Sequence, residues 1–259
     1  MAKPWLSYAN LSDNYERKAR FLPAVLTVLP LLPLTATLGG RFFGWLEVLI
    51  GGVGIGAFVA VGLSHVASAM GNRLQSKLWP RWPHDSPTNQ WLHPDSQKTS
   101  RQQRELWYGS AKGLVGIDLR AAVAAGEDIE AAINDAVSAL RNIFWHRPEA
   151  DRLRIHNVDY GFARNLTGLR PIWIGFLLAT AIACWGAYLQ GHSDILPWAS
   201  VSTLFAVVLV PLGLWVLPGY VRTKATYYAE SFFGTLDAVA KAETKVQQPQ
   251  NGVRDRPPD

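Results

Sequence analysis

Cysteine is almost absent from this 259-residue sequence, and so are the motifs that mark common enzyme classes. The single cysteine, Cys184, lies inside an apolar run, so a disulfide framework is excluded. Patterns of the G-x-S-x-G, H-E-x-x-H and phosphate-loop types do not occur, and the glycine-rich residues 51–56 fall within another apolar run. We therefore expect no catalytic residue, no cofactor and no bound metal ion, and we predict that the protein is not an enzyme.

Charged residues are also missing from four long apolar runs, residues 21–39, 44–69, 172–189 and 198–217, with Glu47 as the one exception. Each run is close to the ~20 helical residues needed to cross ~30 Å of hydrocarbon. Because a backbone in lipid must satisfy its own hydrogen bonds, such runs are helical. Internal prolines and the lack of a small-x-small cleavage site favour a retained anchor over a secretory signal for the first run. The sequence predicts an all-α membrane protein with four transmembrane helices, arranged as two hairpins with a helical cytoplasmic insertion.

Positive charge is distributed unevenly around these runs. Of 25 Lys and Arg residues, only Arg41 falls in a short connector between paired runs, and residues 191–197 contain none. This is the positive-inside pattern of multi-pass proteins. It predicts a multi-pass membrane protein with both termini in the cytoplasm. The net charge of +5 is then explained by topology, so we expect the lipid bilayer as a partner and do not expect nucleic acid.

These patterns divide the chain into five predicted segments. They are a cytoplasmic N-terminal segment (1–20), a first transmembrane hairpin (21–70), a cytoplasmic helical domain (71–170), a second transmembrane hairpin (171–218), and a cytoplasmic C-terminal helix with a disordered tail (219–259).

The central segment reads as helical throughout. Four prolines between residues 80 and 94 disfavour continuation of the preceding helix and indicate a loop, and helices are predicted near 99–113, 127–145 and 149–166. Gly168 suits a left-handed closing position, and Pro171 suits the first turn of the next helix. The apolar pattern of residues 228–240 predicts a further helix, which packs either on the central domain or on a neighbouring subunit.

Small residues four apart form one face in each of two runs. Such faces let helix backbones approach closely in lipid, where apolar burial contributes little to association. We expect the two faces to pack within one chain or between copies, and hence a homo-oligomer. The predicted packing residues are Gly52, Gly56, Ala60, Ser64, Ser68, Gly175, Ala179, Ala183 and Ala187.

Ionisable groups inside the runs are few. Glu47 lies about one turn from the outer end of the second run, and His65 lies near its inner end. An intramembrane carboxylate can line an ion path, or it can simply reach water at the boundary. The second hypothesis for function is accordingly a small channel or transporter with Glu47 near its mouth.

Two His–Asp units occur in the Trp/Pro-rich loop of residues 79–95. His84 precedes Asp85, and His93 precedes Pro94 and Asp95. Such pairs invite an acid–base or metal role, but their spacing matches no ligand pattern. A membrane-tethered enzyme that uses this loop is therefore the third hypothesis, and ordinary loop chemistry is the alternative.

The stretch of residues 157–171 is the most specified in the sequence. It reads N-x-x-Y-G-F-x-R-N-x-x-G-L-R-P and places Tyr160, Arg164, Asn165 and Arg170 at the predicted membrane surface. Arginines there can hold phosphates of lipids or of a ligand. The two readings are an anion or partner docking site and a structural anchor for the adjoining helices.

This stretch, together with Pro87-Thr88-x-x-Trp91, resembles a group of uncharacterised bacterial four-span inner-membrane proteins with a cytoplasmic domain between two helical hairpins. The group implies the layout and no particular activity. The layout is also similar to that of four-span effectors of bacterial antiviral systems. We expect a non-enzymatic oligomeric effector or scaffold for defence or stress, whose cytoplasmic domain senses a protein partner or a small ligand.

Overall fold

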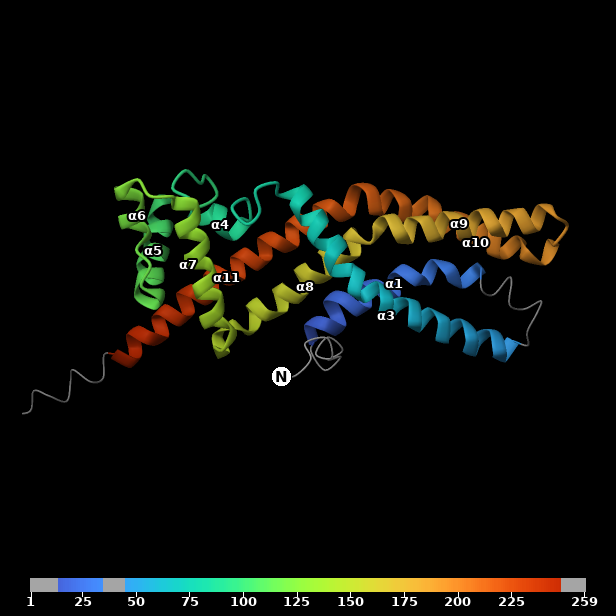
Figure 1. The fold of residues 1–259 in the computed structure, drawn as a ribbon, viewed down its shortest axis with the longest axis horizontal. Coiled ribbons are helices and arrows are strands. Elements are labelled where there is room, and N and C mark those ends of the chain that lie inside the picture. The colour runs from blue at the N-terminus through green and yellow to red at the C-terminus, as the bar shows by residue number, and fades with distance from the viewer. Residues whose placement is uncertain (1–13, 35–44, 248–259) are drawn as a thin grey trace, which may run out of the picture. The chain divides into compact units, whose positions relative to one another are not determined.

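Helices form every regular element in residues 14–34 and 45–247, the parts of the chain that this computed structural model describes (Figure 1). The side chains of residues 45–58 and 246–247 lie outside that description. The chain divides into two compact units: residues 1–78 with 158–224, and residues 79–157 with 225–259. The division falls inside two helices, α8 (Asp151–Gly168) and α11 (Leu217–Gln247). The predicted all-helical class is confirmed for the described residues.

The N-terminal helix of the first unit is irregular. It passes from a π-helical turn (Glu16–Phe21) through α1 (Leu22–Val28) to a 3-10 turn (Leu29–Leu31). Prolines at positions 23, 30 and 33 explain the changes of pitch, because each removes one amide donor from the helical ladder. This helix packs against α3, a continuous helix over Trp45–Leu78.

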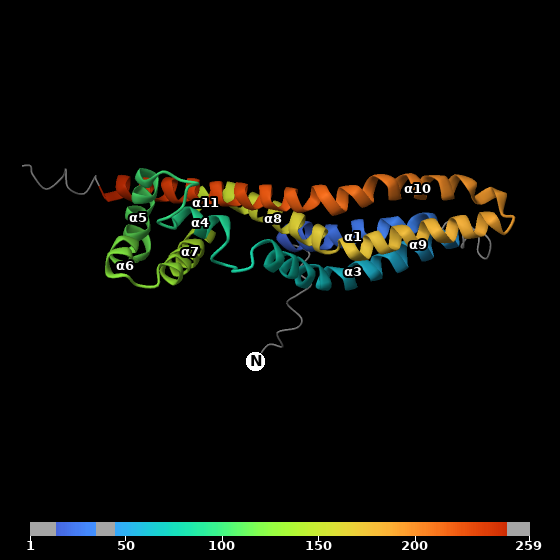
Figure 2. The ribbon, with the colours of Figure 1, turned by 90° about the horizontal axis from the view of Figure 1, so that it is seen from above.

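A second pair of helices in this unit, α9 (Arg170–Leu189) and α10 (Leu196–Pro211), runs side by side in both views (Figure 1, Figure 2). A 3-10 turn (Ser193–Ile195) joins them, and Pro171 lies in the first turn of α9 as predicted. Their contact buries Cys184 of α9 with Ile195 and Ala199. Past Pro211 the chain forms a π-helical turn (Leu212–Val216) and then enters α11.

Among the described residues, two helical stretches are long and apolar enough to cross a membrane, Arg170–Leu189 and Ser193–Lys245. Only 22% and 11% of their most apolar windows are buried within the chain. The core helix of a water-soluble protein would instead be mostly buried. By length and composition, the third and fourth apolar runs lie in helices able to cross a membrane, and the four-span layout stays a prediction.

The second unit contains α4 (Pro87–Leu92), α5 (Arg101–Val115), α6 (Leu119–Ala125), α7 (Ile129–Trp145), a 3-10 turn (Pro148–Ala150) and parts of α8 and α11. Side chains at the N-caps satisfy the first amides of four of these helices; the caps are Ser86, Ser100, Asp118 and Asp128. Left-handed glycines at 116 (φ 75°) and 126 (φ 67°) close α5 and α6.

The core of the second unit forms where α7 meets α11. The buried face of α7 has the expected three- and four-residue spacing, with Ile133, Leu140 and Phe144 at its centre. Phe232 and Phe233 of α11 belong to the same cluster, and the Phe233 ring stacks on Trp107 with centroids 3.9 Å apart. Of the two predicted positions for the C-terminal helix, the structure shows the one on the central domain.

Two local expectations were wrong. Residues 87–92 form a helix within the proline-rich stretch, because Pro87 occupies its first turn and Ser86 caps it. Gly168 is helical rather than left-handed, since the positive-φ glycines of the described residues are 116, 126 and 191. Its role is close packing, as described next.

Candidate functional site

Three of the four predicted docking residues, Tyr160, Arg164 and Asn165, form one polar cluster with Gln75 inside the first unit, which we call the elbow cluster; the fourth, Arg170, lies outside it. The Tyr160 hydroxyl and the Arg164 guanidinium both donate to Oε1 of Gln75, at 3.0 and 2.9 Å. Asn165 donates from Nδ2 to the carbonyl of Ala19, at 2.7 Å. The cluster therefore connects α8 both to α3 and to the N-terminal helix.

Close backbone approach between α3 and α8 makes these hydrogen bonds reachable. A Cβ atom added to Gly168 would lie 2.7 Å from the backbone nitrogen of Gly71. One added to Gly71 would lie 2.1 Å from Oδ1 of Asn165. Glycine is thus required at position 168, where the atoms met are backbone; at position 71 they belong to the side chains of Asn165 and Arg164, which a larger residue would displace.

Prolines explain why two side chains of this region donate to backbone carbonyls. Ala19 lies in the π-helical turn, and residue 23, the α-helical donor position for its carbonyl, is Pro23 and has no amide hydrogen; Asn165 donates to this carbonyl from another helix. Arg170 donates to the Gly213 carbonyl at 3.4 Å. There the amide of Leu217 bonds to Leu212 instead, and residue 218 is again a proline.

These contacts bear on the docking prediction. Tyr160 and Asn165 are buried and bonded within the chain, so they act as helix connectors here. Arg164 and Arg170 are half-buried, and each also makes a bond within the chain. Binding of an anion or partner by these two arginines stays a prediction.

The predicted small-residue faces coincide only in part with the helix faces that are buried within the chain. On α9 the buried side chains are Trp173, Leu177, Thr180 and Cys184, whereas Gly175, Ala179 and Ala183 are exposed and Ala187 is half-buried. On α3, Ala60 is buried and Ser64 and Ser68 are half-buried. Gly52, Gly56 and Glu47 lie in the part of α3 whose side chains are outside the description, and His65 is exposed.

The His–Asp units come together in the second unit around a cavity of about 280 Å³, here called the loop pocket. Arg81 forms ion pairs with Asp85 and with Glu130 of α7, both at 2.9 Å. His84 lies 3.9 Å from Glu130 through Nδ1, and His93 lies 3.8 Å from Asp95. Hydrogen bonding and charge from Asp85 raise the pKa of Arg81 above its usual value.

The loop pocket does not have the geometry of a metal site. Among the described residues, no group of three or more His, Cys, Asp or Glu side chains is arranged to hold an ion. Asp85 and Glu130 are instead engaged by Arg81. What the arrangement offers is a polar surface that joins the loop to α7.

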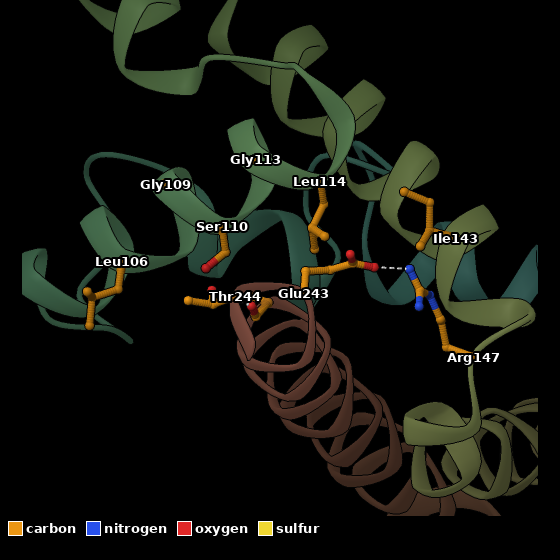
Figure 3. Close-up of a pocket in the computed structure, with 10 residues that line it drawn as sticks. Leu106, Gly109, Ser110, Gly113, Leu114, Ile143, Arg147, Glu243 and Thr244 are labelled. Carbon is orange, nitrogen blue, oxygen red and sulfur yellow. Dashed lines mark hydrogen bonds and ion pairs between the residues drawn. The ribbon is translucent and has the colours of Figure 1, made fainter. Parts of the chain in front are cut away.

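A third feature, which the sequence did not reveal, is a groove of about 560 Å³ between α5, the end of α7 and α11 (Figure 3). We call it the α5–α11 groove. The small residues Gly109, Ser110 and Gly113 line the groove on α5, and Leu106, 59% exposed, lies beside them. An ion pair between Arg147 and Glu243 lies along its edge. The sequence signal for this groove is the four-residue spacing of Gly109 and Gly113, which is informative only together with the position of α11.

Comparison with models of protein families finds none that matches this chain. No curated protein and no solved structure matches it either. The resemblance to four-span inner-membrane proteins therefore stays a prediction, and no activity or ligand is transferred from a relative.

Proposed function

We propose that the chain is a non-enzymatic, multi-pass protein of a bacterial inner membrane, whose second unit lies in the cytoplasm, receives a small ligand or partner, and couples it to the membrane part. In its sharpest form this is an effector of defence or stress that alters the membrane when the ligand binds. The observation that carries the proposal is that the first unit contains two helices with exposed apolar side chains, while the second unit of the same chain has its own helical core.

The apolar surface of the second hairpin supports the membrane part of this proposal. Ile182 is 72% exposed on α9, Val207 is 65% exposed on α10, and Trp215 is 75% exposed just beyond. In water, each large apolar side chain left exposed forgoes about 1.5–3 kcal/mol of burial energy. Lipid removes that penalty, so a bilayer is the solvent that suits these faces.

The α5–α11 groove supports the receiving role. Its wall on α11 belongs to a helix whose Phe232 and Phe233 sit in the core of the same unit. A ligand that fills the groove would thus contact an element held by the core rather than a loose loop. Its volume lies in the range of about 300–1,000 Å³ that is typical of small-molecule sites.

The open stripe on α9 supports assembly into a homo-oligomer. No described atom outside the local helix lies within 4 Å of the Cβ position at Gly175, and Ala179 and Ala183 continue the stripe. In lipid a second helix can approach such a surface closely. Replacing Gly175 and Ala179 with leucine should shift the detergent-solubilised protein to smaller assemblies. Leucine at the similarly exposed Ile182 is the matched control.

The test of function is expression in bacteria while a potential-sensitive dye reports the membrane. The unaltered chain should fractionate with the inner membrane and lower the potential under an inducing condition. The Gly175→Leu/Ala179→Leu variant should reach the membrane but leave the potential unchanged. Recovery of the unaltered chain in the soluble fraction, or an unchanged potential under every condition tried, would refute the proposal.

A tethered enzyme is the second candidate, because the structure gathers His84 and His93 around the loop pocket. The Nδ1 atom of each lies within 4 Å of a carboxylate oxygen, and that of His93 accepts a hydrogen bond from the Asp95 amide. Changing both histidines to glutamine should abolish any turnover found for the purified chain while leaving its thermal unfolding unchanged. Turnover that persists in the double variant removes this candidate.

A further inference from the structure

The second unit contains another cavity, of about 400 Å³, whose lining is rich in arginine. Arg101 and Arg104 of α5 and Arg120 of α6 contribute three positive charges, and Glu105 contributes one negative charge. The lining of the cavity therefore has an excess of two positive charges. We call this cavity the arginine pocket.

Arg104 is the fixed element of the pocket. Its side chain is buried, at 9% exposure, and it donates to the carbonyls of Ser96 (2.7 Å), Thr99 (2.6 Å) and Pro94 (2.8 Å). These carbonyls satisfy hydrogen bonds and fix the guanidinium plane without cancelling its charge. No described acidic side chain forms an ion pair with Arg104. A buried cation that lacks a countercharge is costly on its own, and an anion would relieve that cost.

Arg101 adds a second cation without an acidic partner among the described residues. It is exposed and is the first residue of α5, where the helix dipole also favours negative charge. Arg120 differs, because its Nε bonds Glu105 at 2.6 Å. The Tyr108 hydroxyl donates to the Leu92 carbonyl, and burial raises its pKa, so it stays a neutral wall of the pocket.

We propose that the arginine pocket binds the phosphate group of a small soluble molecule, with Arg101 and Arg104 as its main contacts. The inference rests on the proposed function, in which the second unit receives a ligand. A phosphomonoester carries close to two negative charges at neutral pH, which matches the excess charge of the pocket. Arginine suits it because the planar fork donates two parallel hydrogen bonds to phosphate oxygens.

The bland alternative is that Arg104 only fastens the loop of residues 94–99 to α5. Arg101 and Glu105 separate the two readings, since neither bonds that loop in the structure. Arg101→Gln should weaken phosphate binding about tenfold, the equivalent of one strong charge-assisted contact. Glu105→Gln should strengthen binding several-fold, because it removes the one negative charge of the lining, while Arg120 keeps its hydrogen bond to the backbone carbonyl of residue 105. A merely structural cluster would show neither change.

The experiment is calorimetric titration of the purified full chain, in a neutral detergent, with inorganic phosphate and with AMP. Chloride at matched ionic strength controls for screening, and Arg141→Gln, an exposed arginine of α7 outside the pocket, controls for lost surface charge. Vesicles that contain phosphatidic acid form a separate arm, to distinguish a lipid headgroup from a soluble phosphate.

Saturable binding of phosphate or AMP that weakens in Arg101→Gln, strengthens in Glu105→Gln and is unchanged in Arg141→Gln is the expected result. Absence of binding, binding unaffected by Arg101→Gln, or binding to phosphatidic acid vesicles alone overturns the inference. The measurement involves no membrane potential. If the titration fails but the potential falls in cells, only the phosphate-binding inference is refuted. If the titration succeeds without depolarisation, only the effector role is refuted.

Discussion

Replacement of Gly168 by alanine gives the sharpest test of how α3 and α8 pack. The new Cβ would lie 2.7 Å from the Gly71 nitrogen, about 1 Å inside the usual contact distance of ~3.5–4.0 Å. The atoms it meets are backbone, so the helices must separate rather than let a side chain rotate away. Overpacking of this kind costs about 1–3 kcal/mol.

Gly62→Ala on α3 is the matched control, because no described atom outside the local helix lies within 4 Å of its Cβ position. Both variants gain the same helix propensity, up to about 1 kcal/mol, so the overpacking cost should appear as the difference between them. For a chain of this size, each kcal/mol shifts the unfolding temperature by ~2–4 °C. Gly168→Ala should therefore unfold a few degrees to about 10 °C below Gly62→Ala.

The buried thiol of Cys184 provides the assay, because it is the only cysteine in the sequence. A thiol-reactive dye should label it only as the first unit unfolds, which gives an unfolding curve in detergent. Equal unfolding temperatures for Gly168→Ala and Gly62→Ala would show that α3 and α8 do not approach as closely as described.

Three further predictions concern other parts of the chain. Lys112 and two backbone amides lower the pKa of Asp118 below 3.8, so the carboxylate stabilises the fold above that pH, and this stabilisation is lost as pH falls through the lowered pKa. Asp118→Asn should therefore remove this acid dependence from unfolding curves recorded between pH 5 and 2, and an unchanged dependence would contradict the prediction. Asn165→Ala leaves the Ala19 carbonyl without its side-chain donor and should cost about 1–3 kcal/mol in thermal unfolding, whereas a neutral result would mean that another group can replace the amide. If the chain conducts ions, Glu47→Gln should alter flux in reconstituted vesicles, and identical flux would eliminate Glu47 as a pore residue.

Local chemistry made much of the helical layout predictable. The α7 helix was anticipated because its apolar positions repeat at helical spacing between an acidic start and a proline, and its observed bounds, Ile129–Trp145, fall inside the predicted 127–145. Pro171 marked the start of α9 correctly, since the first turn of a helix needs no donor from that residue. In both cases the deciding interactions lie within a few residues along the chain.

Features that depend on distant partners were not predictable in this way. Gly168 looked like a helix terminator, because nothing nearby in sequence indicates that Gly71 lies against it. The elbow residues looked like an anion site, because their bonds to Gln75 and Ala19 join positions 85 or more residues apart. The loop pocket and the α5–α11 groove likewise exist only through α7 and α11.

The prolines of the first unit also fix the axial alignment of its helices. Each of two carbonyls, on Ala19 and Gly213, accepts a hydrogen bond from a side chain of a distant element, Asn165 or Arg170. If α8 slid by one turn, about 5.4 Å, past the N-terminal helix, Asn165 could no longer reach the carbonyl of Ala19. A buried carbonyl left without a donor costs about 1–3 kcal/mol, so wrong alignments are disfavoured. In this chain proline, which is usually regarded as a helix breaker, thus helps to determine which helices pack together and at what axial position.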